Sequence, residues 1–362
     1  MVEAQSTASP GAATGSVAAE RAASLRRLFP EGVPTLWCPP LVHYDEEGQI
    51  DGKRIAAHLR HLSRHIEGFL VPGSTGDGWE LSDSERKQVL EIALEQAQQL
   101  EAHLLIGALK PRVAEMQATI GGDLEWLKRR TKEPDTKLAL GAARVRGFTV
   151  CPPRGKDLAQ EEIQRGLTSI LEMGLPTAIY QLPQITHNEL SAAVALELAK
   201  RFENFLWFKD SSGADRVALS GKDLGGVFTM RGGEGDYERW LKAAGGPYEG
   251  FLLGSANVFA RELFQIIQDV SAGRKQAARQ QSQQVTAIVR EVAPLVSDMP
   301  GAVAFAGANK ALDHFFAYGP RAAGATPPRM HGGGQLPVEL IRATGEILKR
   351  HGLLPARGYL ET

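Results

Sequence analysis

Residues 177–213 read TAIYQLPQITHNELSAAVALELAKRFENFLWFKDSSG, and this stretch decides the fold. A short apolar run at 177–182 is followed by a helix-periodic segment at 188–202 and by a second apolar run at 205–208. Both runs are apolar almost throughout, which is typical of parallel strands that are covered on both faces. The stretch therefore predicts a strand–helix–strand unit with parallel strands.

The same alternation continues in both directions along the chain. Eight short apolar runs are separated by polar, mostly helix-periodic stretches, and they lie at 33–38, 68–71, 103–108, 147–151, 177–182, 205–208, 227–230 and 250–253. Eight strands alternating with helices predict an α/β protein with a (β/α)8 (TIM) barrel. A doubly wound sheet is the competing fold, but no Gly-x-Gly-x-x-Gly pattern follows the first run to support it.

The predicted barrel spans residues 30–270 of the 362 residues, so the rest of the chain is additional. Residues 1–29 are rich in small residues and lack the apolar segment of a secretory signal, which predicts a disordered tail, with an organelle-targeting segment as the weaker alternative. The segment 116–144 is too long for one helix and its connections, and its charged portion predicts a surface insertion. Helix-periodic stretches over 271–362 predict a C-terminal helical appendage.

Composition excludes several classes of function. The chain has 41 Lys and Arg against 42 Asp and Glu, so its formal net charge of -1 gives no general attraction to nucleic acid or to an anionic membrane. No apolar run approaches the roughly 18–20 residues that span a bilayer. The two cysteines, Cys38 and Cys151, are too few for a disulfide scaffold and match no zinc motif, so we expect a cytoplasmic protein.

Three histidines, His58, His61 and His65, follow one another at helical spacing. A metal site is conceivable there, but Arg60 and Arg64 lie between them and no carboxylate joins the set. The helix would also lie on the outer face of the barrel. We therefore expect no metal at these histidines.

The active site of a barrel lies at the carboxyl ends of its strands, so the polar residues that end the apolar runs are the candidates. The second run ends in PGSTGD at 72–77. Gly73 and Gly76 allow a sharp turn with exposed N–H groups, and Ser74 and Thr75 add hydroxyl donors. Such a loop can hold a small carboxylate or phosphate, although a plain strand-to-helix turn has the same composition. No Lys-Ser/Thr pair follows, so it is not a P-loop.

Lys209 ends the sixth run, after two aromatic residues. Burial disfavours the charged ammonium and leaves a neutral amine, which suits Schiff-base formation with a ketone. The alternative is a lysine that reaches solvent at the rim or pairs with Asp210. Lys110 ends the third run, but Pro111 and Arg112 follow it at once, which indicates an open loop.

Tyr180 lies near the end of the fifth run, in IYQLP at 179–183, and it comes from the strand next to that of Lys209. Its phenol can pass protons to and from a substrate held by the lysine. Taken alone, the position is more typical of a packed tyrosine with a satisfied hydroxyl. After the seventh run, RGGEGD at 231–236 forms a polar loop that we expect to contact substrate.

Together these features resemble the dihydrodipicolinate synthase / N-acetylneuraminate lyase family of class I aldolases, over roughly residues 30–270. GSTGD at 73–77 is similar to the family's Gly-Thr/Ser-Thr-Gly-Glu loop, which binds the carboxylate of pyruvate. IYQLP at 179–183 is similar to its Tyr-Asn-Val-Pro segment, and FKDSSG at 208–213 to its Lys-Asp-Ser-Ser-Gly segment. GSAN at 254–257, after the eighth run, also fits.

The resemblance implies roles for particular residues. Lys209 would be the Schiff-base lysine and Tyr180 the proton-transferring tyrosine. The implied substrate-binding residues are Gly73, Ser74, Thr75, Arg154, Gly233 and Ser255. No metal or organic cofactor is implied, because the protonated imine is itself an electron sink. The family resemblance also implies a homodimer or a homotetramer.

Three departures separate this chain from true dihydrodipicolinate synthases. Where those enzymes carry an arginine that grips the carboxylate of the aldehyde, this chain has Gln184-Ile185-Thr186. Their Thr-Pro-Tyr-Tyr reads here as Cys-Pro-Pro-Arg at 151–154, so the second tyrosine falls on Arg154, which either binds an acidic substrate group or covers an interface. Gln181 and Leu182 replace the family's Asn and Val.

The sequence therefore predicts a Schiff-base-forming lyase that acts on pyruvate or another small 2-oxo acid and is not a true dihydrodipicolinate synthase. One alternative is a dehydratase of a sugar-derived 2-oxo acid. The other is a non-catalytic barrel that binds a carboxylate.

Overall fold

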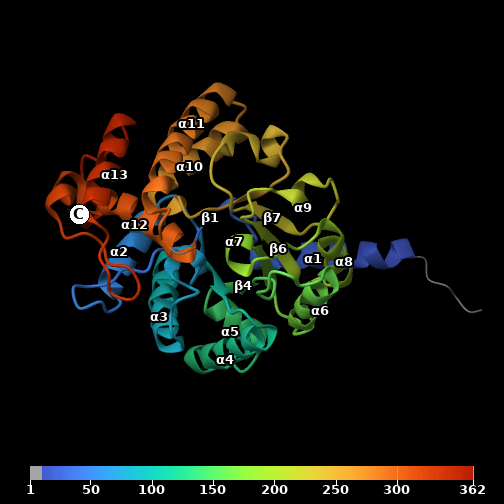
Figure 1. The fold of residues 1–362 in the computed structure, drawn as a ribbon. Coiled ribbons are helices and arrows are strands. Elements are labelled where there is room, and N and C mark those ends of the chain that lie inside the picture. Colours follow the sequence, from blue (N-terminus) through green and yellow to red (C-terminus); the bar gives the residue numbers. More distant parts are fainter. Residues whose placement is uncertain (1–9, 300, 362) are drawn as a thin grey trace, which may run out of the picture.

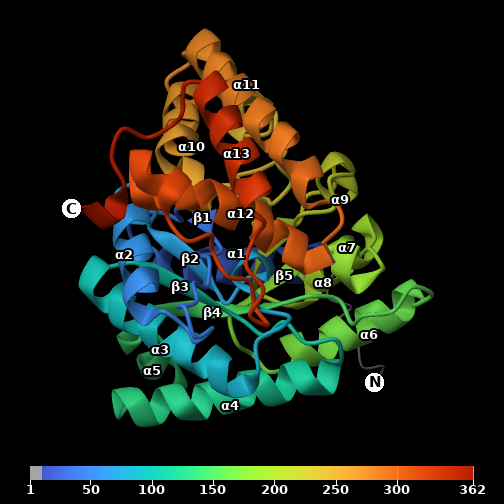
Figure 2. The same cartoon turned by 60° about the vertical axis from the view of Figure 1, so that its left-hand side comes forward.

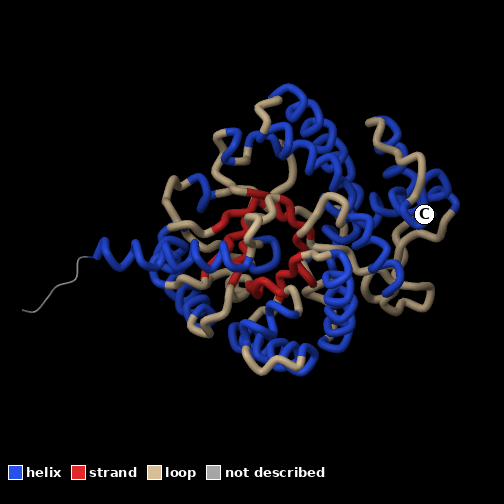
Figure 3. Tube along the Cα trace, turned by 180° about the vertical axis from the view of Figure 1, so that it is seen from behind, coloured by secondary structure: helices blue, strands red, loops and turns tan. Residues whose placement is uncertain are grey.

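Eight parallel strands form a closed barrel, in which each strand pairs with the next and β8 pairs with β1 (Figure 1; strands in red in Figure 3). The computed structural model describes residues 10–299 and 301–361. The strands are β1 Leu36–Cys38, β2 Gly68–Val71, β3 His103–Gly107, β4 Val145–Val150, β5 Thr177–Gln181, β6 Phe205–Asp210, β7 Phe228–Arg231 and β8 Gly250–Leu252. Each apolar run overlaps one strand, so the predicted (β/α)8 barrel is confirmed.

Helices cover the outside of the barrel (Figure 1). They are α2 Gly52–Leu62, α3 Asp83–Leu100, α4 Val113–Thr131, α5 Thr136–Ala142, α6 Gln160–Leu171, α8 Ala192–Arg201, α9 Arg216–Leu219 and α10 Ala256–Ser271, while the short helix α7 Pro183–Thr186 follows β5 at the carboxyl ends of the strands. The connection from β7 to β8 holds only the 3₁₀ turns Tyr237–Arg239 and Lys242–Ala244. The helical layer is therefore thin beside β7, where polar loops reach the end of the barrel.

Two tryptophans dominate the barrel interior. Trp37 of β1 and Trp207 of β6 are fully buried and pack with inward-facing residues of the other strands, among them Leu70 and Leu105. A Cβ on Gly68 would lie 2.3 Å from the Trp37 ring, so only glycine fits opposite it. Because side chains alternate along a strand, Lys209, two residues after Trp207, also points inward.

Helix α1, Pro10–Leu28, occupies most of the segment that we predicted to be a disordered tail, so that prediction is wrong for residues 10–28. Residues 1–9 lie outside the described residues. The helix lies across the end of the barrel that faces the viewer in Figure 3. Buried Arg21 anchors it by donating to the carbonyls of Ala199, Phe202, Phe205, Leu224 and Gly225. Phe29 then packs edge-on against Trp37 and Trp207.

The segment 116–144, predicted as a surface insertion, consists of most of α4 and all of α5. Residues 132–135 join the two helices. Ala139 and Leu140 of α5 are buried, so this addition is packed on the barrel as a further helix rather than a solvated loop. Its charged residues remain mostly on the outside.

Three helices follow the barrel: α11 Lys275–Val292, α12 Gly301–Tyr318 and α13 Val338–Arg350. Helix α11 packs along α10, while α12 contacts the 3₁₀ turn Ser74–Gly76 and α7 (Figure 2). The C-terminal region therefore reaches the carboxyl ends of the strands. Among the described residues, no helix is both long and apolar enough to cross a membrane.

Candidate active site

Lys209 and Tyr180 lie side by side on the inner face of the barrel. They are paired residues of β6 and β5, and each is only 3% exposed. The Lys209 Nζ atom lies 3.7 Å from the centre of the Tyr180 ring. Each residue comes near the carboxyl end of its strand, where barrel enzymes carry their chemistry. The structure thus brings together the two residues that the sequence analysis singled out as catalytic.

The environment of Lys209 disfavours a charged side chain. Burial is the main cause that lowers the pKa of Lys209 to about 7, and the nearby Cys151, Glu234 and Cys38 offset this only in part. Within the described part of the chain, no carboxylate forms an ion pair with its Nζ. Asp210 does not pair with it, because the Asp210 carboxylate accepts the N–H of Ser212. A substantial fraction of the amine is therefore neutral near pH 7.

The Tyr180 phenol belongs to a short network of hydroxyl groups. It forms hydrogen bonds with the side chains of Ser74 and Ser211, while burial raises the pKa of Tyr180. The phenol is therefore protonated in the resting protein, and its neighbours provide a path for a proton. Ser211 was not singled out from the sequence, although it lies within the Lys-Asp-Ser-Ser-Gly-like segment.

The loop at 73–77 folds back against the turn that follows β1. Ser74 and Thr75 are buried, and the Ser74 Oγ accepts a hydrogen bond of 2.9 Å from the Trp79 indole N–H. A Cβ on Gly73 would lie 2.5 Å from Pro39 Cβ, and one on Gly76 would lie 2.3 Å from the Pro40 carbonyl oxygen. The glycines therefore allow this close approach, and the loop presents the Ser74 hydroxyl to Tyr180.

The loops after β7 and β8 are tied together by Glu234. Its carboxylate accepts the Ser255 N–H at 3.0 Å, the Ser255 hydroxyl at 2.6 Å and the Tyr237 hydroxyl at 2.8 Å. A Cβ on Gly254 would lie 3.1 Å from Thr75 Oγ1, so this pair of loops borders the loop at 73–77. The sequence predicted that the polar loop at 231–236 contacts substrate, but it did not single out Glu234, because only the polar composition of the loop is visible there.

The structure places the two remaining predicted binding residues differently. The Gly233 carbonyl accepts a hydrogen bond from buried Arg231, which indicates a structural role. Gly232, and not Gly233, packs against Lys209, because a Cβ on Gly232 would lie 2.8 Å from Lys209 Cε. Arg154 is exposed, and its Nη2 atom lies 3.4 Å from His187 Nε2, so it is not part of the buried group around Lys209.

An apolar cluster forms one wall beside Tyr180. Its buried members are Leu109, Cys151, Tyr180, Leu182 and Ile185, and Trp79 packs against them. Ile185 thus stands in apolar surroundings where the resemblance would place a substrate-gripping arginine. Trp79 was not predicted to contribute to the site. The sequence shows only that an aromatic residue stands two positions after Asp77 of the loop.

The two histidines of α2, His58 and His61, and His65 just after the helix contact different residues. His58 is buried and makes hydrogen-bond contacts of 2.9 Å with the Asn257 carbonyl and 3.2 Å with His43. The ring of His61 stacks on that of Tyr359, and His65 lies near Phe264. In residues 10–299 and 301–361, no three His, Cys, Asp or Glu side chains are grouped so as to hold a metal ion.

A buried ion pair from outside the barrel holds the end of the loop at 73–77. Asp77 has a left-handed backbone with φ of 54°. Its carboxylate accepts hydrogen bonds of 3.1 Å from Lys310 Nζ of α12 and 3.0 Å from the Tyr44 hydroxyl. Both charged side chains are almost fully buried, at 0% and 2% exposure. Helix α12 therefore fixes the loop that carries Ser74 and Thr75.

Replacing Lys310 by methionine should destabilise the protein by about 3–5 kcal/mol, because it leaves the Asp77 carboxylate buried without a cation. Urea unfolding at neutral pH measures the loss. The matched control is the double variant Asp77→Asn/Lys310→Met, which removes both charges and should recover at least half of the loss. A single variant as stable as the unmodified protein would contradict the role of this pair.

The structure is a (β/α)8 barrel in which a buried lysine and a buried tyrosine lie on neighbouring strands. Residues 140–310 match the sequence model of the "Dihydrodipicolinate synthetase family". An uncharacterised DapA-like lyase from Rhizobium meliloti is 28% identical over 46% of this chain and 50% of its own length. A 4-hydroxy-tetrahydrodipicolinate synthase from Aquifex aeolicus is 25% identical over 65% of this chain and 74% of its own length.

Solved structures show the same fold. A prophage protein of the dihydrodipicolinic acid synthase family from E. coli K12, solved with pyruvate, has a TM-score of 0.66 and 18% identity, covering 89% of this chain and all of that one. A variant of the Sulfolobus solfataricus 2-keto-3-deoxygluconate aldolase has a TM-score of 0.66 and 16% identity, covering 88% and 96%. The chain is therefore similar to the dihydrodipicolinate synthase / N-acetylneuraminate lyase family, with the family model matching just under half of its length. The first relative is matched over only half its length, and the synthase over about three quarters.

Proposed function

We propose that this protein is a Schiff-base-forming lyase that acts on pyruvate or another 2-oxo acid. The observation that carries the proposal is the buried Lys209 amine, whose pKa lies near 7 and whose Nζ contacts the ring of Tyr180. A purely structural lysine in this position would cost folding energy without a partner to offset it. The similarity to the dihydrodipicolinate synthetase family over residues 140–310 supports the same reaction class.

The chemistry begins when the neutral Lys209 amine attacks the ketone carbon of the 2-oxo acid. Loss of water from the carbinolamine gives a protonated imine, which accepts an electron pair from the neighbouring carbon. That pair comes from a C–H bond, giving an enamine, or from the C–C bond that breaks as an aldehyde leaves. Ser74 and Thr75 hold the carboxylate. Tyr180 passes the proton to and from the substrate, and the hydroxyls of Ser74 and Ser211 extend the path.

The two sides of the site suggest which substrates fit. Ile185 and Leu182 form an apolar wall with Trp79, which does not suit a second carboxylate. This supports a substrate other than that of the synthases named above. The loops after β7 and β8 carry Glu234 and Ser255, which suit a substrate with hydroxyl groups. Product identification with hydroxylated 2-oxo acids separates C–C cleavage from C–O cleavage. A homodimer or homotetramer remains part of the proposal through the family resemblance alone.

Trapping with borohydride in the presence of pyruvate tests the proposal. One pyruvate-derived mass adduct should form per chain, on the peptide that contains Lys209. Because the pKa is lowered, the neutral amine should become fully available about 1 pH unit above 7, so the trapping rate should rise between about pH 6 and 8 and then level off. With an ordinary lysine pKa, the trapping rate would instead continue to rise up to about pH 10.

The Lys110→Met variant is the matched control for this experiment. Lys110 follows β3 by three residues, and it pairs with Asp83 at 2.9 Å near the surface, so its loss should leave the adduct intact. Absence of an adduct with pyruvate and with every other 2-oxo acid tried would show that the lysine is not a Schiff-base nucleophile.

A further inference from the structure

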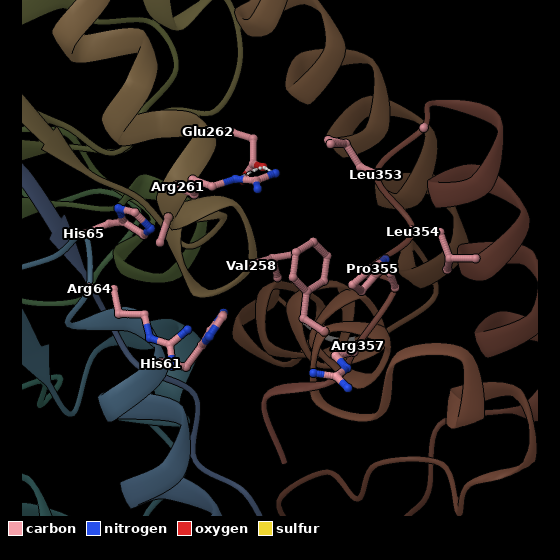
Figure 4. A pocket seen from close by; sticks show the side chains of 14 residues that line it. His61, Arg64, His65, Val258, Arg261, Glu262, Leu353, Leu354, Pro355 and Arg357 are labelled. Carbon is pink, nitrogen blue, oxygen red and sulfur yellow. Dashed lines mark hydrogen bonds and ion pairs between the residues drawn. The ribbon is translucent and has the colours of Figure 1, made fainter. Parts of the chain in front are cut away.

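A second cavity, of about 390 Å³, lies on the outer face of the barrel (Figure 4). Most of its lining comes from three parts of the chain: the end of α2 and the residues after it, the first turns of α10, and the C-terminal segment 352–357. Phe316 of α12 completes the lining. It shares no lining residue with the site around Lys209. Nothing in the proposed lyase reaction uses it.

The charged lining of this cavity is strongly unbalanced. Arg64, Arg261 and Arg357 face it from the three walls, while Glu262 is its one acidic residue (Figure 4). Glu262 is already engaged, because its carboxylate accepts hydrogen bonds from Arg261 at 2.6 and 3.0 Å. In the part of the chain that the structure describes, neither Arg64 nor Arg357 forms an ion pair. Two guanidinium groups are therefore available to an anion.

Two histidines add donors that are neutral in the empty cavity. Burial is the largest cause that lowers the pKa of His61 to about 4, and Arg64 contributes repulsion. The pKa of His65 is also lowered, again mainly by burial, with Arg261 and Arg64 acting in the same direction and Glu262 against them. The positive charge of the cavity at neutral pH therefore resides on the guanidinium groups.

The rest of the lining is apolar. Val258 and Phe316 come from the barrel side and from α12, and Leu353, Leu354 and Pro355 come from the C-terminal segment (Figure 4). A ligand that fits this cavity has a charged end for the arginines and a carbon part for these side chains. The volume is that of a small metabolite rather than a peptide or a nucleic acid.

We propose that this cavity binds a small organic phosphate ester, with the phosphoryl group on Arg64 and Arg357 and the carbon part on Phe316 and Leu353. A phosphoryl group carries close to two negative charges and three acceptor oxygens, so it can neutralise both free guanidinium groups, which are planar forks suited to such oxygens. A monocarboxylate, with a single negative charge, would neutralise only one of the two guanidinium groups. The bound ester would join α2 to the C-terminal segment.

Calorimetric titration with phenyl phosphate and with inorganic phosphate, at constant ionic strength, tests the proposal. Phenyl phosphate should bind at one site per chain, about tenfold more tightly than inorganic phosphate, because its ring buries apolar surface. Arg64→Gln/Arg357→Gln should weaken phenyl phosphate binding at least about tenfold, since it removes both charge-assisted contacts. Arg279→Gln, an exposed arginine of α11 outside the cavity, is the matched control and should leave binding unchanged.

Four results would overturn the inference. The first is no heat of binding with either probe, and the second is the same affinity for phenyl phosphate as for inorganic phosphate. The third is an affinity for succinate equal to that for phenyl phosphate. The fourth is that the double arginine variant binds phenyl phosphate as tightly as the unmodified protein. A Ser74→Ala/Thr75→Ala variant decides whether the probe instead enters the barrel. It should bind phenyl phosphate normally, and loss of binding in it would place the ligand at the Lys209 site. This test does not depend on the lyase proposal.

Discussion

Replacing Lys209 by methionine is expected to abolish trapping of pyruvate and to lower turnover by about 10⁴–10⁶-fold, because the nucleophile is lost. Methionine has a similar length and no charge, so it fits beside Gly232 and Tyr180. Turnover can be followed without knowing the acceptor aldehyde, as exchange of the pyruvate methyl protons with deuterated solvent. Each exchange event requires one imine and one enamine.

The same variant has a stability signature that separates lost chemistry from lost structure. The pKa of Lys209 is lower in the folded protein than in the unfolded chain, so the folded state binds fewer protons between about pH 7 and 10.5. Stability from this group therefore rises with pH across that window. Lys209→Met should be more stable than the unmodified protein at pH 7, by on the order of 4 kcal/mol, and the difference should vanish near pH 10.5.

Two outcomes would contradict this account. One is a pyruvate adduct that persists on another residue of Lys209→Met. The other is a variant that is less stable than the unmodified protein at pH 7, because the lysine would then be a stabilising ion-pair partner. Lys110→Met, which should keep both exchange and trapping, controls for the loss of a lysine at a strand end.

Replacing Tyr180 by phenylalanine is expected to slow methyl-proton exchange by about 10²–10⁴-fold while leaving the imine trappable. Phenylalanine keeps the ring that contacts Lys209 and that packs in the apolar wall. Only the hydroxyl that joins Ser74 to Ser211 is lost. The variant therefore separates proton transfer from imine formation, which depends on the amine.

The matched control is Tyr248→Phe. Tyr248 is buried and donates a 2.6 Å hydrogen bond to Asp215, so its substitution costs stability without touching the hydroxyl network at Lys209. Exchange in this control should stay close to the unmodified rate. Unchanged exchange in Tyr180→Phe would remove Tyr180 from the mechanism, and a joint loss of exchange and trapping would point to a distorted site.

The strands and the central pair were predictable because their signals are local. A strand buried on both faces is an apolar run, and a polar residue that ends such a run must lie at the mouth of a barrel. Tyr180 and Lys209 lie near the ends of neighbouring runs, and the strand register places them together. The glycine-rich composition of 73–77 indicated its turn in the same way.

What escaped the sequence analysis depends on contacts between distant residues. Arg21 looks like one of several arginines in a low-complexity segment, yet it orders α1 through carbonyls about 180–200 positions away. The residues around Lys310 in α12 do not indicate that it pairs with Asp77. Glu234 accepts hydrogen bonds from Ser255 only because the loops after β7 and β8 lie together in the fold. Neither spacing nor composition encodes such contacts.

The Arg21 and Lys310 contacts also constrain how this chain is completed during synthesis. Arg21 emerges early, but its acceptors extend to Gly225, so α1 can dock only after most of the barrel has been translated. The ion pair of Asp77 forms later still, because its partner Lys310 of α12 must first be translated. The loop that carries Ser74 and Thr75 therefore reaches its final structure after all eight strands have been made. A nascent chain that ends before α12 would hold the lysine–tyrosine pair, but its loop at 73–77 would lack the Asp77–Lys310 ion pair.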